Sequence, residues 1–596
     1  MKKNTKTRNL GNQFLIMAIV ALIVSSCTHK KPSGDIAKTR STGTIESIQS
    51  SSKSSHQNHH GVTGHHIKTD GLSSNTLATG PIYTVGSQEL CAEGAQELKD
   101  PPTLHADNLM LDTKLAAINA IKCVNGKLIT LQSYVDERLG MDNRPVGPAY
   151  ILQVDKTKPN PQLHINFKNA LGPENQEYEC GHHGADVKQC SNLHTHGFHV
   201  SPTAPSDDVF LKLSPADPAF QYKFDIPNFH APGTHWLHAH LHGSTAPQVK
   251  QGMAGALILK GAIDHSFAND YGIAGDKEKI MIFQQLEDIS GNVLCGNAAD
   301  GSPRTTSING QCLPNVTVQA GNVYRWRMIH AGVSATVNMR VENSAGDTVT
   351  LREYARDGIT MQGAVDLEGV TLQPGYRSDV LVKIPQCPSN QYPCKLFIVD
   401  DESAAHKSLY GKAEDHSVIA TIIVDAIAKN EMRLPDRNAA LFQNPYPFIP
   451  DSELKKVNGE NVVQKIWFAN EPNPNDPNST LKTVNGAVFP DGTTERLQLD
   501  TATLWDIWVG DKQGSTVNHP FHIHVNPFQV TEYDVNGHPF HYWKDTLLIS
   551  GTYNKGEANA ITVRSRYENF VGEFVLHCHN LNHEDAGMMK KVEIYR

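Results

Sequence analysis

The sequence has no excess of basic over acidic residues. Its 596 residues include 53 Lys and Arg and 62 Asp and Glu, so the net charge is 53 − 62 = −9 with neutral histidine. A mildly acidic chain argues against nucleic acid as the main partner. The hydrophobic fraction of 39% is low for a polytopic membrane protein and sufficient for several buried cores. The 45 Gly and 33 Pro are close to ordinary usage, which excludes a collagen-like architecture.

The N-terminus lacks an apolar run long enough to span a bilayer, because the run at residues 14–24 is too short. It follows several positive charges, and Ser25 and Ser26 then precede Cys27 in a pattern that resembles a bacterial lipoprotein signal. No Arg-Arg pair precedes the run, which favours general secretion of the unfolded chain. We therefore predict a signal peptide over 1–27 and a chain held by lipid at Cys27 in the bacterial cell envelope, on the periplasmic side or the cell surface. The alternative is that this apolar run is not removed and remains as a short anchor.

Residues 28–84 contain almost no aromatic side chains and are rich in Ser, Thr, Lys, Gly and His. Such a segment buries too little apolar surface to offset the entropy of ordering, so we predict a disordered tether. Five of its histidines lie close together: His56, His59, His60, His65 and His66. They are interpreted either as a loose metal-scavenging group or as part of a solvated linker.

Closely spaced Cys-x-x-Cys pairs are also missing, which argues against a zinc or iron–sulfur site. Ten cysteines are present, and Cys27 and Cys578 have other predicted roles. The remaining eight permit many pairings, so their connectivity does not follow from the sequence. The simplest hypothesis pairs neighbours within single domains, as 91–123, 180–190, 295–312 and 387–394. Disulfides of this kind indicate an oxidising compartment.

Helical periodicity is scarce beyond residue 85, and the best helical candidate is 111–121. Short β-rich runs separated by turn residues dominate instead, at 127–134, 163–167, 254–259, 279–283, 348–354, 379–383, 418–424 and 561–563. Asn-Gly pairs at 125, 309, 485 and 536 add hairpin signals. This pattern predicts β-sandwiches. We expect three, at 85–265, 266–434 and 435–596, with the Pro-rich segment 435–450 leading into the last.

Histidine is abundant and unevenly distributed. Of 30 histidines, eight lie between His194 and His242. Four constellations stand out: His194 with His196; His238 with His240; His519 with His522 and His524; and His577-Cys578-His579 followed by His583 and Met588. One His-x-His pair is weak support for a metal site, but the complete set is strong.

Strand geometry explains this spacing. Residues i and i+2 project to one face of a strand, so each His-x-His presents two imidazoles on the same side. Between His577 and His579, the Cys578 thiolate points the other way, so one tripeptide can serve two metal sites. Cysteine, two histidines and a weak methionine form the ligand set of a blue-copper site. Cys578, His583 and Met588 lie in one stretch, and His519 would complete the set.

With these motifs, residues 100–596 resemble a three-domain multicopper oxidase of the bacterial laccase-like kind. The resemblance implies an all-β fold of three consecutive cupredoxin-like Greek-key β-sandwich domains and four copper ions. It implies a type 1 copper on His519, Cys578 and His583 with Met588 axial, and type 2 ligands His194 and His522. The implied ligands of the type 3 pair are His196, His238, His240, His524, His577 and His579. Two departures replace no ligand: Thr195 stands where Trp is common, and His235 stands where an aromatic residue is usual.

The resemblance also implies two acidic residues that move protons to reduced O2, Glu584 and Asp207. Asp208 competes with Asp207, and either role could instead belong to an ordinary turn or surface acid. Other histidines are interpreted as supporting or packing residues rather than ligands: His199, His230, His235 and His242. His182 and His183 are expected on a loop closed by a disulfide.

The expected function is one-electron oxidation of a small donor coupled to four-electron reduction of O2. Candidate donors are phenols, aromatic amines, Cu(I), Fe(II) and Mn(II). With 12 methionines and only Met588 and Met589 adjacent, a dedicated cuprous oxidase is less supported. The alternatives are a metallo-oxidase (ferroxidase or cuprous oxidase), a copper-sequestering tolerance protein and a non-catalytic cupredoxin scaffold. A two-domain copper nitrite reductase is disfavoured by chain length. We expect a monomer that contacts the membrane only through its N-terminal lipid.

Overall fold

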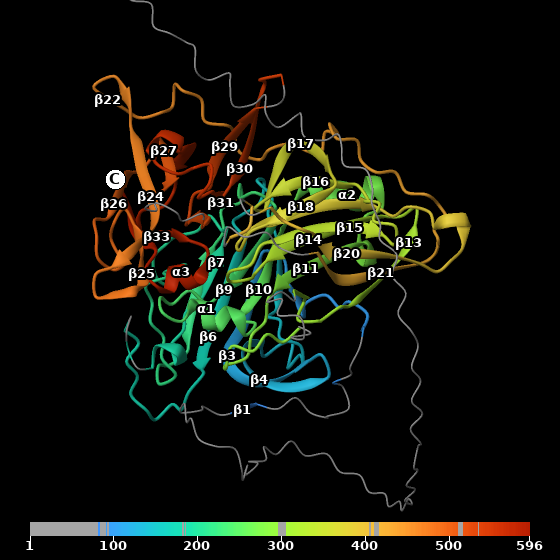
Figure 1. The fold of residues 1–596 in the computed structure, drawn as a ribbon, viewed down its shortest axis with the longest axis horizontal. Coiled ribbons are helices and arrows are strands. Elements are labelled where there is room, and N and C mark those ends of the chain that lie inside the picture. Colours follow the sequence, from blue (N-terminus) through green and yellow to red (C-terminus); the bar gives the residue numbers. More distant parts are fainter. Residues whose placement is uncertain are drawn as a thin grey trace, which may run out of the picture. The chain divides into compact units, whose positions relative to one another are not determined.

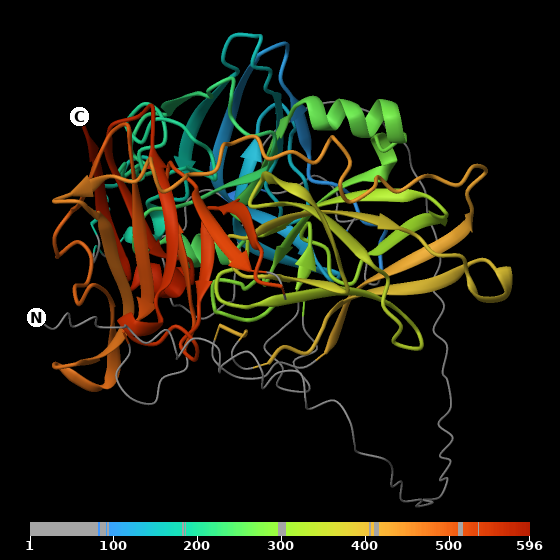
Figure 2. The same ribbon diagram turned by 90° about the horizontal axis from the view of Figure 1, so that it is seen from above.

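The computed structural model describes residues 82–83, 91, 95–181, 184, 186–295, 306–404, 407–409, 416–510, 517–533 and 536–596. The predicted signal peptide, Cys27, the tether histidines, His182 and His183 lie outside these residues. No helix in the described ranges is both long and apolar enough to cross a membrane. The described strands form three successive pairs of sheets and one two-stranded sheet at residues 456–461, and all of them belong to one compact unit (Figures 1 and 2).

The first domain comprises the two sheets within residues 82–260. Its strands are β1 (Ile82–Tyr83), β2 (Thr103–His105), β3 (Met110–Val124), β4 (Lys127–Asp136), β5 (Ala149–Gln153), β6 (Gln162–Ala170), β7 (His194–His196), β8 (Phe220–Asp225), β9 (Gly233–His238) and β10 (Ala254–Lys260). One sheet has the order β1-β3-β6-β8 with β4 on β3, and the other has the order β2-β5-β10-β9-β7. Apolar side chains of both sheets, including Tyr150, Phe167 and Tyr222, meet in a buried core.

Two predictions about this domain need correction. Residues 111–121, predicted as a helix, lie in β3, which pairs with β1, β4 and β6. Their helix-forming Leu, Ala and Lys residues are overridden by pairing and by burial, which alternates along the first half of the strand. In addition, Ile82 and Tyr83 fall inside the predicted tether but pair with β3, so the paired chain begins before residue 85.

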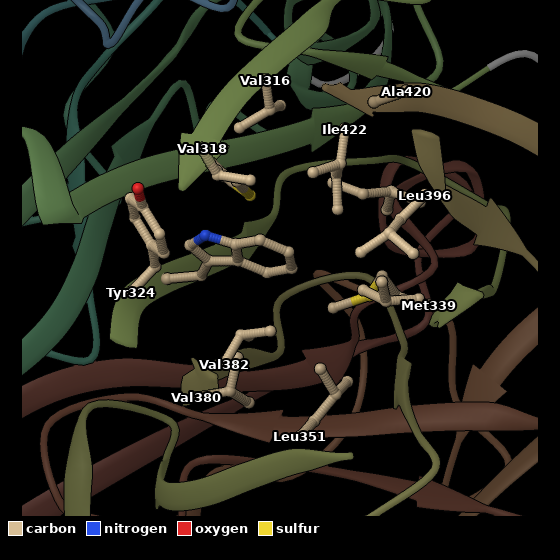
Figure 3. Close-up of a cluster of buried hydrophobic side chains, with 14 of the residues drawn as sticks. Val316, Val318, Tyr324, Met339, Leu351, Val380, Val382, Leu396, Ala420 and Ile422 are labelled. Carbon is tan, nitrogen blue, oxygen red and sulfur yellow. The ribbon is translucent and has the colours of Figure 1, made fainter. Parts of the chain in front are cut away.

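The second domain comprises the two sheets within residues 278–427. Its strands are β11 (Glu278–Gln284), β12 (Ser307–Ile308), β13 (Asn315–Ala320), β14 (Val323–His330), β15 (Val337–Asn343), β16 (Leu351–Arg356), β17 (Ile359–Leu367), β18 (Gly369–Leu372), β19 (Arg377–Lys383), β20 (Cys394–Asp400) and β21 (Ser417–Ile427). Val318, Val380 and Ile422 project toward one another between the sheets, as Figure 3 shows. A separate apolar cluster joins this domain to the first through Trp236, Ile258, Ile282 and Ile329.

The third domain comprises the sheets within residues 456–595. Its strands are β22 (Lys456–Val457), β23 (Glu460–Asn461), β24 (Val463–Asn473), β25 (Asp476–Val484), β26 (Glu495–Gln498), β27 (Thr501–Val509), β28 (His519–Ile523), β29 (Phe528–Tyr533), β30 (Pro539–Lys544), β31 (Thr546–Ile549), β32 (Ile561–Tyr567), β33 (Gly572–Cys578) and β34 (Met589–Tyr595). The inner sheet has the order β26-β34-β33-β28-β31, so β28 and β33 are hydrogen-bonded neighbours. Every β-rich run predicted from the sequence overlaps a strand of these three domains.

Three α-helices occur in the described ranges: α1 (Thr245–Lys250), α2 (Ala262–Tyr271) and α3 (Leu581–Asp585). Helix α2 follows β10 in the connection between the first and second domains, and Figure 2 shows it as the prominent green helix. Helix α3 carries His583 and lies against α1, because the Asp585 carboxylate accepts hydrogen bonds from the backbone N–H groups of Gly243 and Ala246, both at 2.7 Å. The first and third domains therefore meet directly at these two short helices.

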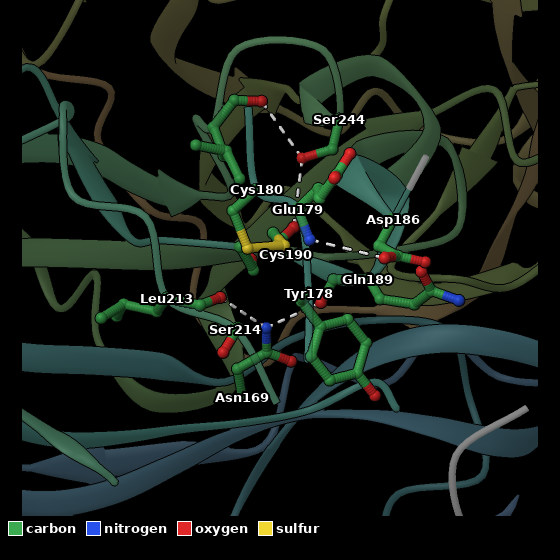
Figure 4. The surroundings of a disulfide bond; sticks show 12 residues. Asn169, Tyr178, Glu179, Cys180, Asp186, Gln189, Cys190, Leu213, Ser214 and Ser244 are labelled. Atoms are coloured by element: carbon green, nitrogen blue, oxygen red, sulfur yellow. Dashed lines mark hydrogen bonds between the residues drawn. A yellow bond between two sulfur atoms is a disulfide. The ribbon is translucent and has the colours of Figure 1, made fainter. Parts of the chain in front are cut away.

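The four predicted disulfides are all formed: Cys91–Cys123, Cys180–Cys190, Cys295–Cys312 and Cys387–Cys394. Figure 4 shows the second of them, which closes the loop just before β7. The Cys190 carbonyl accepts hydrogen bonds from Ser244 Oγ at 3.2 Å and Gln248 Nε2 at 2.7 Å. This loop is thereby fixed to α1, which places the start of β7 firmly beside the third domain.

Candidate metal centres

Strand pairing aligns the histidine motifs opposite one another. In the first domain, β7 and β9 are antiparallel neighbours and His194 stands opposite His238. In the third, β28 and β33 are antiparallel neighbours and His522 stands opposite His577. In three of the four His-x-His pairs, the second histidine lies just past the end of the strand that carries the first: His240 after β9, His524 after β28 and His579 after β33. Each domain therefore presents four imidazoles at one edge, and Figure 1 shows β7, β9 and β33 close together there.

The eight imidazoles from the two domains form one buried cluster, called here the histidine cluster. His240 Nε2 lies 3.1 Å from His577 Nε2, and His196 Nδ1 lies 3.3 Å from His579 Nε2. Rings also stack across the interface, with centroids 4.0 Å apart for His194 and His524 and 3.9 Å apart for His196 and His522. All eight residues are at most 4% exposed: His194, His196, His238, His240, His522, His524, His577 and His579.

The ring nitrogens of the histidine cluster fit a metal. Five of them are buried without a hydrogen-bond partner, namely Nε2 of His194, His238, His522 and His524 and Nδ1 of His579. In three of these rings the other nitrogen is bonded to an oxygen atom: Nδ1 of His194 to a carboxylate, and Nδ1 of His238 and His522 to backbone carbonyls. A buried polar atom without a partner is costly unless a metal or water meets it. The donor set is therefore suited to copper, for which imidazole is a good ligand.

Burial disfavours the charged form of seven of these imidazoles, and metal ligation requires the neutral form. Desolvation, followed by the repulsion between neighbouring rings, holds the pKa of His238, His240 and His524 well below the usual value. The pKa values of four more rings of the cluster are lowered in the same way, again by burial first: His196, His522, His577 and His579. Neutral rings offer lone pairs that a cation can bind without first displacing a proton.

A second group of candidate ligands lies inside the third domain. Cys578 Sγ is 3.5 Å from His519 Nδ1 and 3.7 Å from His583 Nδ1. Met588 is fully buried in the same core as Cys578, and the Cys578 N–H donates to the Met588 carbonyl at 3.0 Å. Cys578 is also the one cysteine of the described residues that is not in a disulfide. The structure thus brings together all four residues that the sequence assigned to a blue-copper site.

The two groups are joined by the tripeptide His577-Cys578-His579. Both imidazoles belong to the histidine cluster, whereas the thiol of Cys578 points into the core of the third domain toward His519. The predicted alternation of side chains along the strand is confirmed. The Cys578 thiol and the two imidazoles, which are candidate ligands of different centres, are consequently separated by only a few covalent bonds.

The structure distinguishes the two candidate aspartates. Asp207 contacts the histidine cluster: its carboxylate oxygens lie 3.1 and 3.0 Å from His194 Nδ1. Asp208 instead accepts a hydrogen bond from the Phe210 N–H at 3.0 Å. Because Nδ1 of His194 is held by the carboxylate, its Nε2 faces the cluster, and Asp207 is the aspartate positioned to influence it.

Glu584 is fully buried beside the histidine cluster. Thr245 Oγ1 donates to its carboxylate at 3.1 Å, and His240 Nδ1 lies 3.8 Å away. Burial, and then the neighbouring Asp585 carboxylate, raises the pKa of Glu584 well above its usual value. Burial also raises the pKa of Asp585 to about 6 despite its hydrogen bonds to backbone N–H groups. Glu584 is therefore placed within reach of the cluster and away from bulk solvent.

The histidines interpreted as non-ligands do not interleave with either group. His199 Nδ1 lies 3.0 Å from the Val525 carbonyl, and His230 Nε2 accepts a hydrogen bond from the His199 N–H. The His242 ring packs against Phe489. His235 is buried against Phe198 and His230, and neither of its ring nitrogens has a partner. A narrow cavity of about 20 Å³ lies between His235 and His199 and reaches His194 and His524, which is room for about one water.

Sequence reasoning missed Asp545, which contacts the histidine cluster, and Arg377, which holds the Asp545 carboxylate. Asp545 Oδ1 lies 3.2 Å from His196 Nε2, and its backbone carbonyl lies 2.8 Å from His522 Nδ1. Arg377, from the second domain, donates to both carboxylate oxygens of Asp545 at 2.7 and 2.5 Å. No local motif signals such a pair, because its members are 168 residues apart.

Comparison with known proteins agrees with the fold and the motifs. Sequence models described as multicopper oxidase match residues 182–263, 286–407 and 455–596, which together exceed half of the chain. A multicopper oxidase of Staphylococcus haemolyticus is 22% identical over 366 residues, which cover 61% of this chain and 68% of that protein. A laccase of Bacillus subtilis is 21% identical over 408 residues, covering 62% and 72%.

Solved structures share the fold at low sequence identity. A multicopper oxidase from Campylobacter jejuni, described as a metallo-oxidase, is 22% identical with a TM-score of 0.60, covering 86% of this chain and 97% of that chain. The McoA multicopper oxidase of Aquifex aeolicus is 17% identical with a TM-score of 0.63, covering 84% and 100%. The three matching models, the cupredoxin domains and the assembled histidine motifs lead to one conclusion. This chain belongs to the multicopper oxidase family of copper-dependent oxidoreductases.

Proposed function

We propose that the chain oxidises a small donor in one-electron steps at a type 1 copper and reduces O2 to water at a trinuclear copper cluster. His519, Cys578 and His583 would hold the type 1 copper with Met588 as the axial ligand. His194 and His522 would hold the type 2 copper, and the other six imidazoles of the histidine cluster would hold the type 3 pair. The arrangement that supports this most strongly is Cys578 itself, which stands in sequence between two imidazoles of the cluster.

The copper ions would supply the redox chemistry, and the chain supplies position and an electron path. Reduction of one O2 requires four electrons, which the donor delivers singly, so the site of donor oxidation must connect to the site of O2 reduction. The covalent link through Cys578 to His577 and His579 provides that connection. Burial of all eight imidazoles excludes bulk water from the place where O2 would be reduced.

Reduction of O2 to two waters also consumes four protons, and two carboxyl groups are placed to deliver them. Asp207 contacts His194 on the side of the proposed type 2 copper. Glu584 lies beside His240, on the side of the proposed type 3 pair. We assign proton transfer to both residues because each combines burial with proximity to a different side of the cluster.

The surroundings of His583 favour organic donors over metal cations. His583 is 7% exposed, whereas Cys578, His519 and Met588 are fully buried, so an electron donor would approach this imidazole. Burial, and then the charges of His519 and Lys482, holds the pKa of His583 well below its usual value. The positive charge of Lys482 opposes the approach of Fe(II), Cu(I) or Mn(II). Phenols and aromatic amines are therefore the proposed donors.

An oxygen electrode and a panel of donors test this function. Copper-loaded protein should consume O2 with a phenolic donor, more slowly with Fe(II), Cu(I) or Mn(II), and not at all after Cys578→Ser. A faster rate with one metal ion would make the protein a metallo-oxidase, as the Campylobacter jejuni structure is described. Copper binding without O2 consumption with any donor would indicate sequestration and overturn the proposal.

We also propose that the chain acts in the bacterial envelope, attached by lipid at Cys27. The four disulfides support this location, because such bonds persist in oxidising compartments. Fractionation of cells that express wild-type protein and Cys27→Ala tests the anchor. Wild-type protein should sediment with membranes and the variant should not, and identical distribution would contradict lipid attachment.

A further inference from the structure

Asp545, like the hydroxyl of the adjacent Thr546, contacts both imidazoles of a stacked pair spanning the domain interface. It stands between β30 and β31 and is 5% exposed. Its carboxylate oxygen lies 3.2 Å from His196 Nε2, and its backbone carbonyl accepts a hydrogen bond from His522 Nδ1 at 2.8 Å. The two rings stack with centroids 3.9 Å apart, so Asp545 closes one side of a pair formed by the first and third domains.

The contact to His196 decides which ring nitrogen faces the cluster. With Nε2 donating to the carboxylate, Nδ1 of His196 is left to face His579 Nε2 at 3.3 Å. If the carboxylate were absent, the Thr546 hydroxyl would remain 3.4 Å from His196 Nε2, but a hydroxyl can either donate or accept and so selects neither tautomer of the buried ring. A metal-binding histidine is commonly oriented by just such a carboxylate, which also strengthens the imidazole as a donor.

The second domain holds this carboxylate in place. Arg377, fully buried on β19, binds both oxygens of Asp545 at 2.7 and 2.5 Å. Its remaining N–H groups donate to backbone carbonyls of Gly375 at 2.9 Å, Asp357 at 2.9 Å and Thr234 at 3.2 Å. One guanidinium therefore contacts all three domains, and a two-pronged bond of this geometry fixes the carboxylate plane.

Two glycines show how closely the second domain approaches the histidine cluster. A Cβ at Gly197 would lie 2.3 Å from a guanidinium nitrogen of Arg377, and the backbone there has a φ of +88°. A Cβ at Gly375 would lie 2.9 Å from the His579 ring, again with a φ of +88°. The loop after His196 can approach the Arg377 guanidinium, and the loop before Arg377 can approach the His579 ring, at these distances only because both residues lack a side chain.

We propose that Asp545, held by Arg377, is a positioning residue for His196, and that the second domain thereby controls copper loading although it supplies no imidazole to the cluster. This inference rests on the proposed function, since it takes His196 as a copper ligand. The proposal predicts that substitution of the Asp545 side chain weakens copper binding at one site and not at the others. His522 is held by the backbone carbonyl of residue 545, which survives substitution of the side chain, so the loss should fall on the copper bound by His196.

Copper affinity and stoichiometry test the proposal without reference to turnover. Asp545→Ala and Arg377→Met should bind one of the four copper ions about 10–100-fold more weakly, the usual cost of losing a carboxylate behind a ligating histidine. The absorption of the type 1 copper should be unchanged. Arg377→Lys, which keeps a charge but not two parallel donors, should be affected less than Arg377→Met.

The matched control is Asp264→Asn, which breaks another buried aspartate–arginine pair. Arg325 donates to Asp264 at 2.6 Å, but neither residue contacts the histidine cluster. This variant should lose stability and keep wild-type copper affinity. The positioning role alone would be overturned if Asp545→Ala kept full copper affinity, or if its copper affinity fell only as much as that of Asp264→Asn. Wild-type protein without copper at the cluster would overturn the proposed function, and the positioning role with it.

Discussion

Removal of copper should loosen the first domain against the third, because the histidine cluster draws four imidazoles from each. The proposed type 1 ligands behave differently, since His519, Cys578, His583 and Met588 all belong to the third domain. Two perturbations therefore separate the effects. Stripping all copper removes the ions at the interface, whereas Cys578→Ser removes only the copper inside one domain. We expect the first to weaken the interface and the second to leave it intact.

The magnitude follows from binding linkage. An ion that binds only the assembled state, at a free concentration 100 times its dissociation constant, contributes about 2.7 kcal/mol. Three interface ions would then contribute about 8 kcal/mol. For domains of this size roughly 2–4 °C of unfolding temperature corresponds to 1 kcal/mol. We therefore expect the copper-free protein to unfold about 20 °C lower.

The interface should weaken without coming apart completely, because direct contacts remain in the absence of copper. Asp585 accepts hydrogen bonds from the backbone N–H groups of Gly243, Thr245 and Ala246, at 2.7, 3.2 and 2.7 Å. Hydrogen bonds to a charged group contribute about 1.5–3 kcal/mol each. These hydrogen bonds do not involve copper, so they keep part of the interface in place after copper is removed. We expect the separate sandwiches to stay folded while the first domain opens against the third.

Calorimetry and limited proteolysis of three samples provide the assay: loaded wild type, copper-free wild type and loaded Cys578→Ser. The copper-free protein should melt earlier and be cut in the connections between domains, near residues 261–277 and 428–455. Loaded Cys578→Ser should resemble the loaded wild type in both measurements. Equal melting and equal cleavage of loaded and copper-free wild type would refute the reasoning, because the cluster would then not join these domains.

Three further outcomes are expected. Met588→Leu should keep the blue copper and raise its potential in a redox titration, because the axial ligand tunes the metal rather than holding it; complete loss of copper would contradict this role. Asp207→Asn should slow reoxidation of the type 1 copper by O2 about 100-fold in stopped flow and leave its reduction by the donor unchanged, since only proton delivery near His194 is altered; equal effects on both steps would exclude it. Burial lowers the pKa of His199 to about 4. The unfolded chain gains a proton on this residue below about pH 6.5, so up to roughly 3 kcal/mol of stability should be lost as pH falls from 6.5 to 4. His199→Gln should flatten that slope in acid unfolding curves, and an unchanged slope would exclude His199 as its source.

The candidate ligands could be predicted from the sequence because their geometry is local. In a strand, residues two apart face the same side whatever the rest of the chain does, so a His-x-His pair fixes its own relative orientation. The His577-Cys578-His579 tripeptide carried the further prediction that the thiol faces another site, and the structure bears this out. The disulfides followed from proximity along the chain, since each closes a short loop within one domain.

The helix predicted at 111–121 was wrong for the converse reason. Residues such as Leu111, Ala116 and Ala117 favour a helix in isolation, but β4 and β6 pair with this segment on either side. The information that selects the strand lies in partners 9 or more residues away along the chain. Propensity is a weak prior when hydrogen bonds to neighbouring strands and burial of one face compete with it.

The pair of Arg377 and Asp545 lies beyond sequence reasoning altogether, and it changes how the second domain is understood. The histidine motifs lie in the first and third domains, which suggests that the second domain only connects them. Yet Gly375 packs on His579, and Arg377 holds the carboxylate that meets His196. A linker of equal length could bring the outer domains together, but it could not supply a buried guanidinium at the stacked rings. The second domain therefore forms one side of the histidine cluster and does more than connect the outer domains, since it faces imidazoles from both of its neighbours.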